Sequence, residues 1–153
     1  MAKLVQEAGP VRLVMDAVTA GEMMSDNPVS VRADATVGEA IELLTRRGFS
    51  AAPVIDVSGR AVGVVSRSDV LVHDREKGSY TSVGAAEEPT PADETRVRDI
   101  MTPVVFSVTP DAPASEVIKQ MLDWKVHHLF VIDQNQVLVG VVSTLDVLKQ
   151  LHP

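Results

Sequence analysis

The chain has 153 residues, 45% of them hydrophobic, and a formal net charge of −7 with an isoelectric point near 5.0. This acidic balance argues against a broad nucleic-acid surface, because phosphate binding depends mainly on Lys and Arg. There is no Cys, which removes disulfides, thiolate chemistry and Cys-based zinc sites. The first residues lack an apolar signal core, and no apolar run reaches the ~20 residues that span a bilayer. We therefore expect a soluble, cytoplasmic protein without a membrane partner.

Residues 1–18 form an N-terminal extension in which Leu13-Val14-Met15 is expected to dock on the core. A short extended piece at 29–31 is then followed by a helix over residues 36–47. Its apolar stripe has helical spacing and consists of Val37, Ala40, Ile41 and Leu44. Thr36 and Glu39 form a capping-box start for this helix. Strands are predicted at 52–56 and 61–65 across a turn at 57–60, and a last helix begins after Ser66.

The next segment, residues 73–95, lacks periodicity and contains a Pro- and Glu-rich tract, so we interpret it as an exposed linker. The same order of elements then returns. An extended piece at 106–108 precedes a helix over 113–125, with Pro113 in its first turn. Its predicted apolar stripe is Val117, Ile118, Met121 and Leu122. Strands at 129–133 and 138–142 follow, and a final helix begins after Ser143.

This similarity is an internal repeat. Residues 24–71 and 101–148 align without a gap at an offset of 77, and 18 of the 48 paired positions are identical. Small units bury too little surface to be stable alone. We therefore predict an α/β (α+β) fold in which two β-α-β-β-α repeats, 19–72 and 96–151, pack through their sheets about a pseudo-two-fold axis.

The motif Gly-h-h-Ser-x-x-Asp (h, hydrophobic) closes both copies, from Gly63 to Asp69 and from Gly140 to Asp146. A strand that ends in Ser, with an acid three residues later, is typical of a helix N-cap. Two copies after the same strand also favour a shared function. Both interpretations, cap and ligand site, stay open at this point.

With the openings Glu22-Met-Met-Ser25 and Asp99-Ile-Met-Thr-Pro103, these features resemble a tandem cystathionine-β-synthase (CBS) domain pair, or Bateman module. The resemblance implies a non-catalytic sensor that binds an adenosine-containing effector: AMP, ADP, ATP, NAD or S-adenosylmethionine. It also implies a homodimer and an effector protein as partner. In the family the sites are cross-built, so that the Ser-x-x-Asp helix start of one repeat faces the adenine-lining strand of the other.

Carried onto this sequence, the resemblance implies two nucleotide sites. The first combines Ser66, Arg67, Ser68, Asp69, Val104, Phe106, His127 and His128. The second combines Asn27, Val29, Ser50, Ala51, Ser143, Thr144 and Asp146. Asp69 and Asp146 are the candidates for the ribose hydroxyls, because a charged acceptor strengthens such hydrogen bonds. No catalytic residues or metal ligands are expected.

The two sites differ in charge. The first contains Arg67 and two histidines, whereas the second has Thr144 and Ser50-Ala51 at those positions. We therefore expect the Asp69 site to take the phosphorylated nucleotide, and the Asp146 site to be weaker, empty or filled by an adenosyl group of little charge. The alternative is a ligand-free dimerisation scaffold in which both serines are only caps. An enzyme and a nucleic-acid-binding protein are disfavoured.

Overall fold

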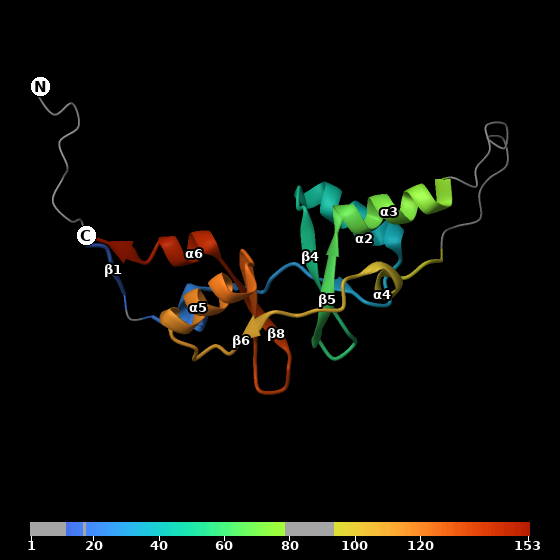
Figure 1. The fold of residues 1–153 in the computed structure, drawn as a ribbon. Coiled ribbons are helices and arrows are strands. Elements are labelled where there is room, and N and C mark those ends of the chain that lie inside the picture. Colours follow the sequence, from blue (N-terminus) through green and yellow to red (C-terminus); the bar gives the residue numbers. More distant parts are fainter. Residues whose placement is uncertain (1–11, 17, 79–93) are drawn as a thin grey trace, which may run out of the picture.

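Two lobes, each packing helices against one face of a small sheet, make up the chain in a computed structural model (Figure 1). The structure describes residues 12–16, 18–78 and 94–153. The first half comprises β3 (Val31–Arg32), α2 (Val37–Arg47), β4 (Ala51–Ile55), β5 (Ala61–Ser66) and α3 (Arg67–Gly78). The second half comprises β6 (Ser107–Val108), α5 (Ala114–Trp124), β7 (His128–Ile132), β8 (Leu138–Ser143) and α6 (Thr144–Leu148). The predicted β-α-β-β-α order is confirmed in both copies.

Each sheet is built around one short antiparallel hairpin. In the first half the strand order is β3-β4-β5, with β3 parallel to β4 and β4 antiparallel to β5. In the second half the order is β2-β8-β7-β6, where β2 (Ser25–Asp26) comes from the chain before the first half. Because side chains alternate across a strand, one face of each sheet packs on helices and the other faces the opposite half.

The helix starts behave largely as expected. Thr36 is the N-cap of α2, and its Oγ1 accepts a hydrogen bond from the Glu39 N–H at 3.2 Å. Gly48 ends the helix in the left-handed conformation, at φ 68°. Two details of the second copy were wrong. Pro113 is the N-cap of α5 and precedes its first turn, and Leu122 is 71% exposed because it lies beyond the edge of the buried stripe.

The linker prediction also needs correction at its start. Helix α3 continues to Gly78, so residues 73–78 are helical. The Pro- and Glu-rich tract lies outside the described residues. The N-terminal extension docks as expected: β1 (Val14–Met15) pairs antiparallel with β9 (Leu151–His152), and Met15 packs against the second core. Across the described residues, no helix is long and apolar enough to cross a membrane.

The two halves exchange their first helices. Helix α1 (Ala20–Met23) belongs to the first sequence copy, yet Ala20 and Met23 are buried in the core of the second half. Helix α4 (Val97–Ile100) belongs to the second copy, yet Val97 is fully buried in the first core. Figure 1 shows this exchange by colour, because the yellow α4 lies beside the green elements of the first half.

Equivalent main-chain hydrogen bonds anchor both exchanged segments. The Ala20 N–H donates to Ala112 O at 2.8 Å, and the Val97 N–H donates to Ala35 O at 2.9 Å. Beyond each helix the chain pairs with the other half's last strand, as Ser25 with Val141 and Thr102 with Val64. The packing units therefore differ from the contiguous sequence copies.

The repeated motif glycines make room for these crossings. A Cβ at Gly63 would lie 2.5 Å from the carbonyl oxygen of Thr102, and a Cβ at Gly140 would overlap the Met24 side chain. Each glycine therefore permits a close approach that any larger residue would block. This explains the first letter of the Gly-h-h-Ser-x-x-Asp motif without reference to a ligand.

Gly63→Ala should lower the free energy of unfolding by roughly 1–3 kcal/mol, because the new methyl group meets a backbone oxygen that is fixed by pairing. Urea unfolding followed by circular dichroism measures this change. Gly38→Ala is the matched control, since its Cβ would meet only Thr36 Oγ1 at 3.9 Å. Alanine favours helix there by ~1 kcal/mol. Equal stability of Gly63→Ala and the wild type would contradict the close approach.

The pair between the chain's two outer strands predicts a pH effect. His152 Nε2 lies 2.7 Å from Asp16 Oδ1, and this hydrogen bond, the Pro153 carbonyl and the Asp16 charge raise the pKa of His152 above its ordinary value of 6.5. The pair should therefore stabilise β1–β9 fully below pH 6.5 and lose its contribution as pH rises through the raised pKa.

Proton NMR titration of the His152 ring would test this. Asp16→Asn should lower the pKa of His152 towards its ordinary value, because the largest cause of the upward shift is removed. The control is Asp123→Asn, an exposed acid on α5. A titration midpoint unaffected by Asp16→Asn would refute the pairing.

Candidate functional site

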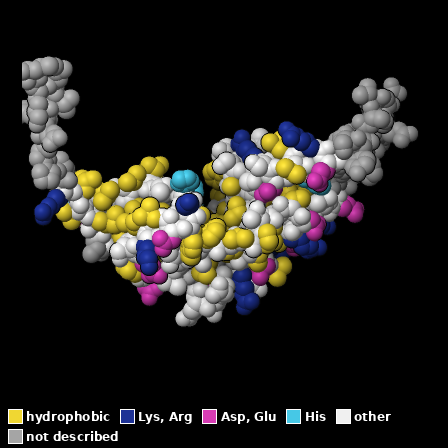
Figure 2. Space-filling model, viewed as in Figure 1, with side chains coloured by type: hydrophobic (Ala, Val, Ile, Leu, Met, Phe, Trp, Pro, Cys, Tyr) yellow, Lys and Arg dark blue, Asp and Glu magenta, His cyan; other side chains and the backbone are white. Residues whose placement is uncertain are grey.

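A cavity of about 570 Å³ lies between the two halves, where the helix-free faces of both sheets meet. Figure 2 shows the corresponding hollow between the lobes, with hydrophobic side chains on its walls and histidine at its rim. Fourteen residues line it: Gly48, Phe49, Ser50, Ala51, Ala52, Pro53, Val64, Val104, Phe106, Val126, His127, His128, Phe130 and Val141.

The phenylalanine residues of the chain gather at this cavity. The sequence contains only three Phe, and all three, Phe49, Phe106 and Phe130, belong to its lining. The single Trp, Trp124, packs behind Phe106 with ring centroids 5.1 Å apart and a tilt of 39°. Such a concentration in a chain with 3% aromatic residues marks a surface suited to a flat, apolar group.

Strand periodicity explains how these side chains reach the cavity. On β7, Leu129 and Val131 are fully buried in the second core, so His128 and Phe130 point to the opposite face. On β4 the lining residues Ala51 and Pro53 occupy the equivalent positions at the offset of 77. The cavity thus combines equivalent strand faces that carry different side chains.

Both Ser-x-x-Asp elements are helix starts with reciprocal caps. The Asp69 N–H donates to Ser66 Oγ at 3.1 Å, and the Ser66 N–H donates to Asp69 Oδ2 at 2.9 Å. Ser143 and Asp146 form the same pair, at 3.2 and 2.8 Å. The capping interpretation is therefore confirmed in both copies. The capping hydrogen bonds engage one oxygen, Oδ2, of each aspartate carboxylate.

Strand register corrects the predicted grouping of residues. His128 pairs with Ser143 across β7–β8, and the Thr144 N–H donates to His127 O at 3.0 Å. The histidines thus adjoin the helix start of their own half, whereas the resemblance implies a site that combines them with Asp69. In the first half Ala51 likewise pairs with Ser66. The physical reason is that an antiparallel hairpin brings the first residue of one strand beside the last residue of the next.

The Arg67 side chain lies against the C-terminal end of α2, a position that the sequence did not indicate. Its Nε donates to Phe49 O at 2.7 Å and its Nη2 to Leu44 O at 3.4 Å, both at the C-terminal end of α2. The guanidinium thus binds carbonyls of its own half.

The cavity brings together part of each predicted site: Ser50, Ala51, Val104, Phe106, His127 and His128. Its lining does not include Asn27, Val29, Ser66, Arg67, Ser68, Asp69, Ser143, Thr144 and Asp146. Sequence reasoning missed Phe49, Pro53 and Phe130 among others. The i, i+2 spacing from Ala51 to Pro53 and from His128 to Phe130 was a usable signal, because such residues share a strand face.

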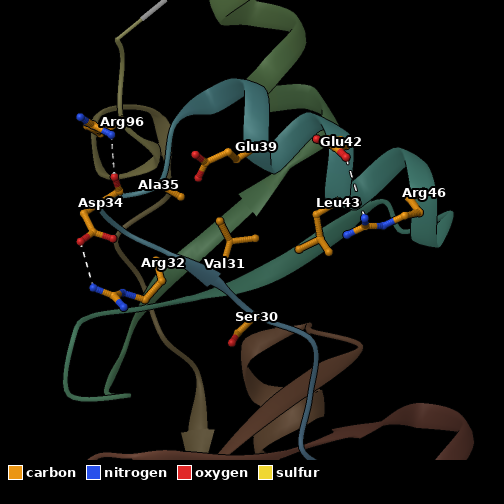
Figure 3. A pocket seen from close by; sticks show the side chains of 10 residues that line it. All are labelled: Ser30, Val31, Arg32, Asp34, Ala35, Glu39, Glu42, Leu43, Arg46 and Arg96. Atoms are coloured by element: carbon orange, nitrogen blue, oxygen red, sulfur yellow. Dashed lines mark hydrogen bonds and ion pairs between the residues drawn. The ribbon is translucent and has the colours of Figure 1, made fainter.

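A second hollow of about 550 Å³ lies on the outside of the first half, between α2 and β3 (Figure 3). Most of its charges are paired: Arg32 contacts Asp34 at 2.9 Å, and Arg46 contacts Glu42 at 3.8 Å. Arg96 donates to the Asp34 carbonyl at 3.0 Å. With most of its charges paired internally and its lining drawn mainly from one half, this groove is a weaker candidate than the central cavity. Among the described residues, no cluster of three or more His, Asp or Glu could hold a metal ion.

The duplicated fold and the shared cavity define a class of paired-repeat modules. Comparison with known proteins identifies the class. The family model of the CBS domain matches residues 20–76 and 97–153, and the chain therefore belongs to the CBS domain family as a tandem pair.

Relatives of this chain include larger proteins. The 5′-AMP-activated protein kinase subunit gamma-3 of Sus scrofa is 32% identical over 112 residues, covering 73% of this chain and 21% of that protein. The magnesium transporter MgtE of Thermus thermophilus is 34% identical over 138 residues, covering 87% and 27%. The chain thus spans about a quarter of the length of these relatives.

Solved structures confirm the fold. CBSX2 in complex with AMP has a TM-score of 0.67 and 27% identity, covering 86% of this chain and 94% of that one, and CBSX2 comes from Arabidopsis thaliana. The cytosolic domain of the Mg²⁺ channel MgtE in complex with ATP has a TM-score of 0.67 and 31% identity, covering 88% and 49%. CBS pairs are generally regulatory and not catalytic.

Proposed function

We propose that this chain is a non-catalytic regulatory module that binds an adenosine-containing ligand in the central cavity and transmits the ligand state to a partner protein. The observation that carries the proposal is the gathering of all three Phe residues in one cavity that both halves build. The complexes of CBSX2 with AMP and of MgtE with ATP support an adenosyl ligand.

The cavity suits such a ligand in size and chemistry. Its volume of about 570 Å³ lies within the ~300–1,000 Å³ of typical small-molecule sites. Stacking of a base on an aromatic side chain contributes ~1–3 kcal/mol. Phe106, backed by Trp124, offers such a surface, and His127 and His128 offer ring nitrogens for hydrogen bonds.

The carboxylates of Asp69 and Asp146 stay candidates for the ribose. A carboxylate has two oxygens with about four lone-pair sites, and capping engages one oxygen in each residue. Both side chains are partly exposed at the starts of α3 and α6. The capping hydrogen bonds would also fix the positions of the two carboxylates for a ligand.

The mechanism is linkage between binding and the arrangement of the halves. A ligand that contacts both halves favours the arrangement in which its contacts are best. Such coupling is reciprocal and typically amounts to ~1–3 kcal/mol. Ligand state would then alter the surface that a partner protein contacts.

The alternative is a ligand-free scaffold, and one observation favours it. Both Ser-x-x-Asp elements are fully explained as caps, and both motif glycines are explained by the helix exchange. The repeated motif alone therefore does not require a ligand. A ligand-free scaffold would, however, not explain why the central cavity exists.

Adenosine, AMP, ADP, ATP, NAD and S-adenosylmethionine should each be tested in thermal unfolding of the full chain. A ligand at ~100 times its Kd contributes ~2.7 kcal/mol. For a chain of this size that raises Tm by roughly 5–10 °C. Fluorescence of Trp124, the only Trp, provides a second measurement because its ring contacts Phe106.

Phe106→Leu should weaken binding by ~1–3 kcal/mol through lost stacking. Val29→Ala is the matched control, because Val29 holds the equivalent position of the first copy and does not line the cavity. No response to any of the six compounds would favour the scaffold.

A homodimer formed through the helices is part of this proposal. Leu71 and Val72 on α3, and Leu145 and Leu148 on α6, are between 54% and 67% exposed. Apolar side chains grouped on helix surfaces favour association. Light scattering should give twice the mass of 16.4 kDa, and Leu148→Glu should reduce it to the monomer value. Leu122→Glu, on exposed α5 surface, is the control. A wild-type monomer would contradict this part.

A further inference from the structure

The central cavity contains no fixed positive charge in its lining. Among the described residues that line it, the only titratable side chains are His127 and His128, and none is Lys, Arg, Asp or Glu. An imidazole is not a permanent cation, unlike a guanidinium. Phosphate sites in proteins depend on guanidinium, ammonium or helix N-termini for charge. The lining side chains therefore offer no permanent cation to a group with several negative charges.

Arg67 is the residue that the sequence offered as a phosphate ligand, and its guanidinium is already engaged. It donates to Phe49 O at 2.7 Å and Leu44 O at 3.4 Å. A cation at the C-terminal end of a helix also interacts favourably with the helix dipole. A phosphate would have to compete with both carbonyls.

These contacts fix one wall of the cavity. Besides the two side-chain bonds, the Arg67 N–H donates to Ser50 O at 2.9 Å. Phe49 and Ser50 both line the cavity. Arg67 thus connects the start of α3 to the segment that carries these two residues into the site.

The duplicate shows that this connection is specific to the first half. Thr144 occupies the position of Arg67, and its Oγ1 reaches only His127 O, at 3.5 Å. Its short side chain has no contact with the end of α5 among the described hydrogen bonds. Capping of α3 and α6 is the same in both halves, so capping does not require an arginine here.

We propose that the cavity selects adenosyl ligands of little negative charge, and that Arg67 is a positioning residue for Phe49 and Ser50 and not a phosphate ligand. The inference rests on the proposed function. It reverses the expectation that the half containing Arg67 takes a phosphorylated nucleotide. Each added phosphate would bring charge into a partly apolar site without a fixed partner.

Calorimetric titration of the full chain with adenosine, AMP and ATP tests the selectivity. Affinity should stay level or fall from adenosine to ATP. An affinity for ATP more than about tenfold above that for adenosine would overturn the inference. If none of the three binds, the proposed function itself fails, which is a distinct result.

Arg67→Ala tests the positioning role. Affinities for adenosine and AMP should fall together by about tenfold, as one charge-assisted hydrogen bond would predict, with their ratio preserved. Hydrogen exchange at the Phe49–Ser50 amides should accelerate. A phosphate ligand would instead lower the AMP affinity at least about tenfold more than the adenosine affinity.

Two further variants keep this test decisive if Arg67→Ala unfolds. Arg67→Lys retains the charge but loses the planar fork, so it should resemble Arg67→Ala in ligand affinity. Selective recovery of AMP binding by Arg67→Lys would overturn the positioning role. Arg47→Ala removes the same charge from the last turn of α2 and should leave both affinities unchanged.

Discussion

The exchange of the first helices holds the rest of the structure in place. Each half completes its core with a helix from the other copy, and the Val64–Thr102 and Ser25–Val141 pairs continue the exchange into the sheets. Neither half has a complete core from its own contiguous copy. The two sheets are consequently held face to face by the main chain itself, and the central cavity is the space left between them. A ligand there would contact both halves.

Much of the fold followed from sequence because the duplication supplied each local signal twice. Alternating and helical periods recur in both copies, and this agreement is the condition for reliable local prediction. The exchange itself was not predictable from these signals. Helices α1 and α4 are four residues long, and their burial depends on tertiary contacts with the opposite core. Leu122 shows a related limit. Helical periodicity indicates that this residue is close to the apolar stripe, but it does not indicate where the buried part of the stripe ends.

The site was predicted in composition but not in arrangement. Six of the fifteen expected residues line one shared cavity, while the Ser-x-x-Asp elements behave as caps. Sequence indicates which chemical groups are present, whereas hairpin register decides which neighbours they meet. Arg67 is the clearest example. Its charge suggested a phosphate ligand, but the main-chain carbonyls of Leu44 and Phe49 in its own half offer partners that sequence spacing does not reveal.

The two motif glycines also determine how freely the copies can diverge. Gly63 faces a main-chain oxygen, which has the same volume whatever residue stands at position 102. Gly140 faces the side chain of Met24, which a substitution could shorten. A larger residue at 140 is therefore compatible with a smaller one at 24, so these two positions should covary among relatives, while position 63 should remain glycine. The symmetric motif thus conceals unequal evolutionary constraints on its two copies.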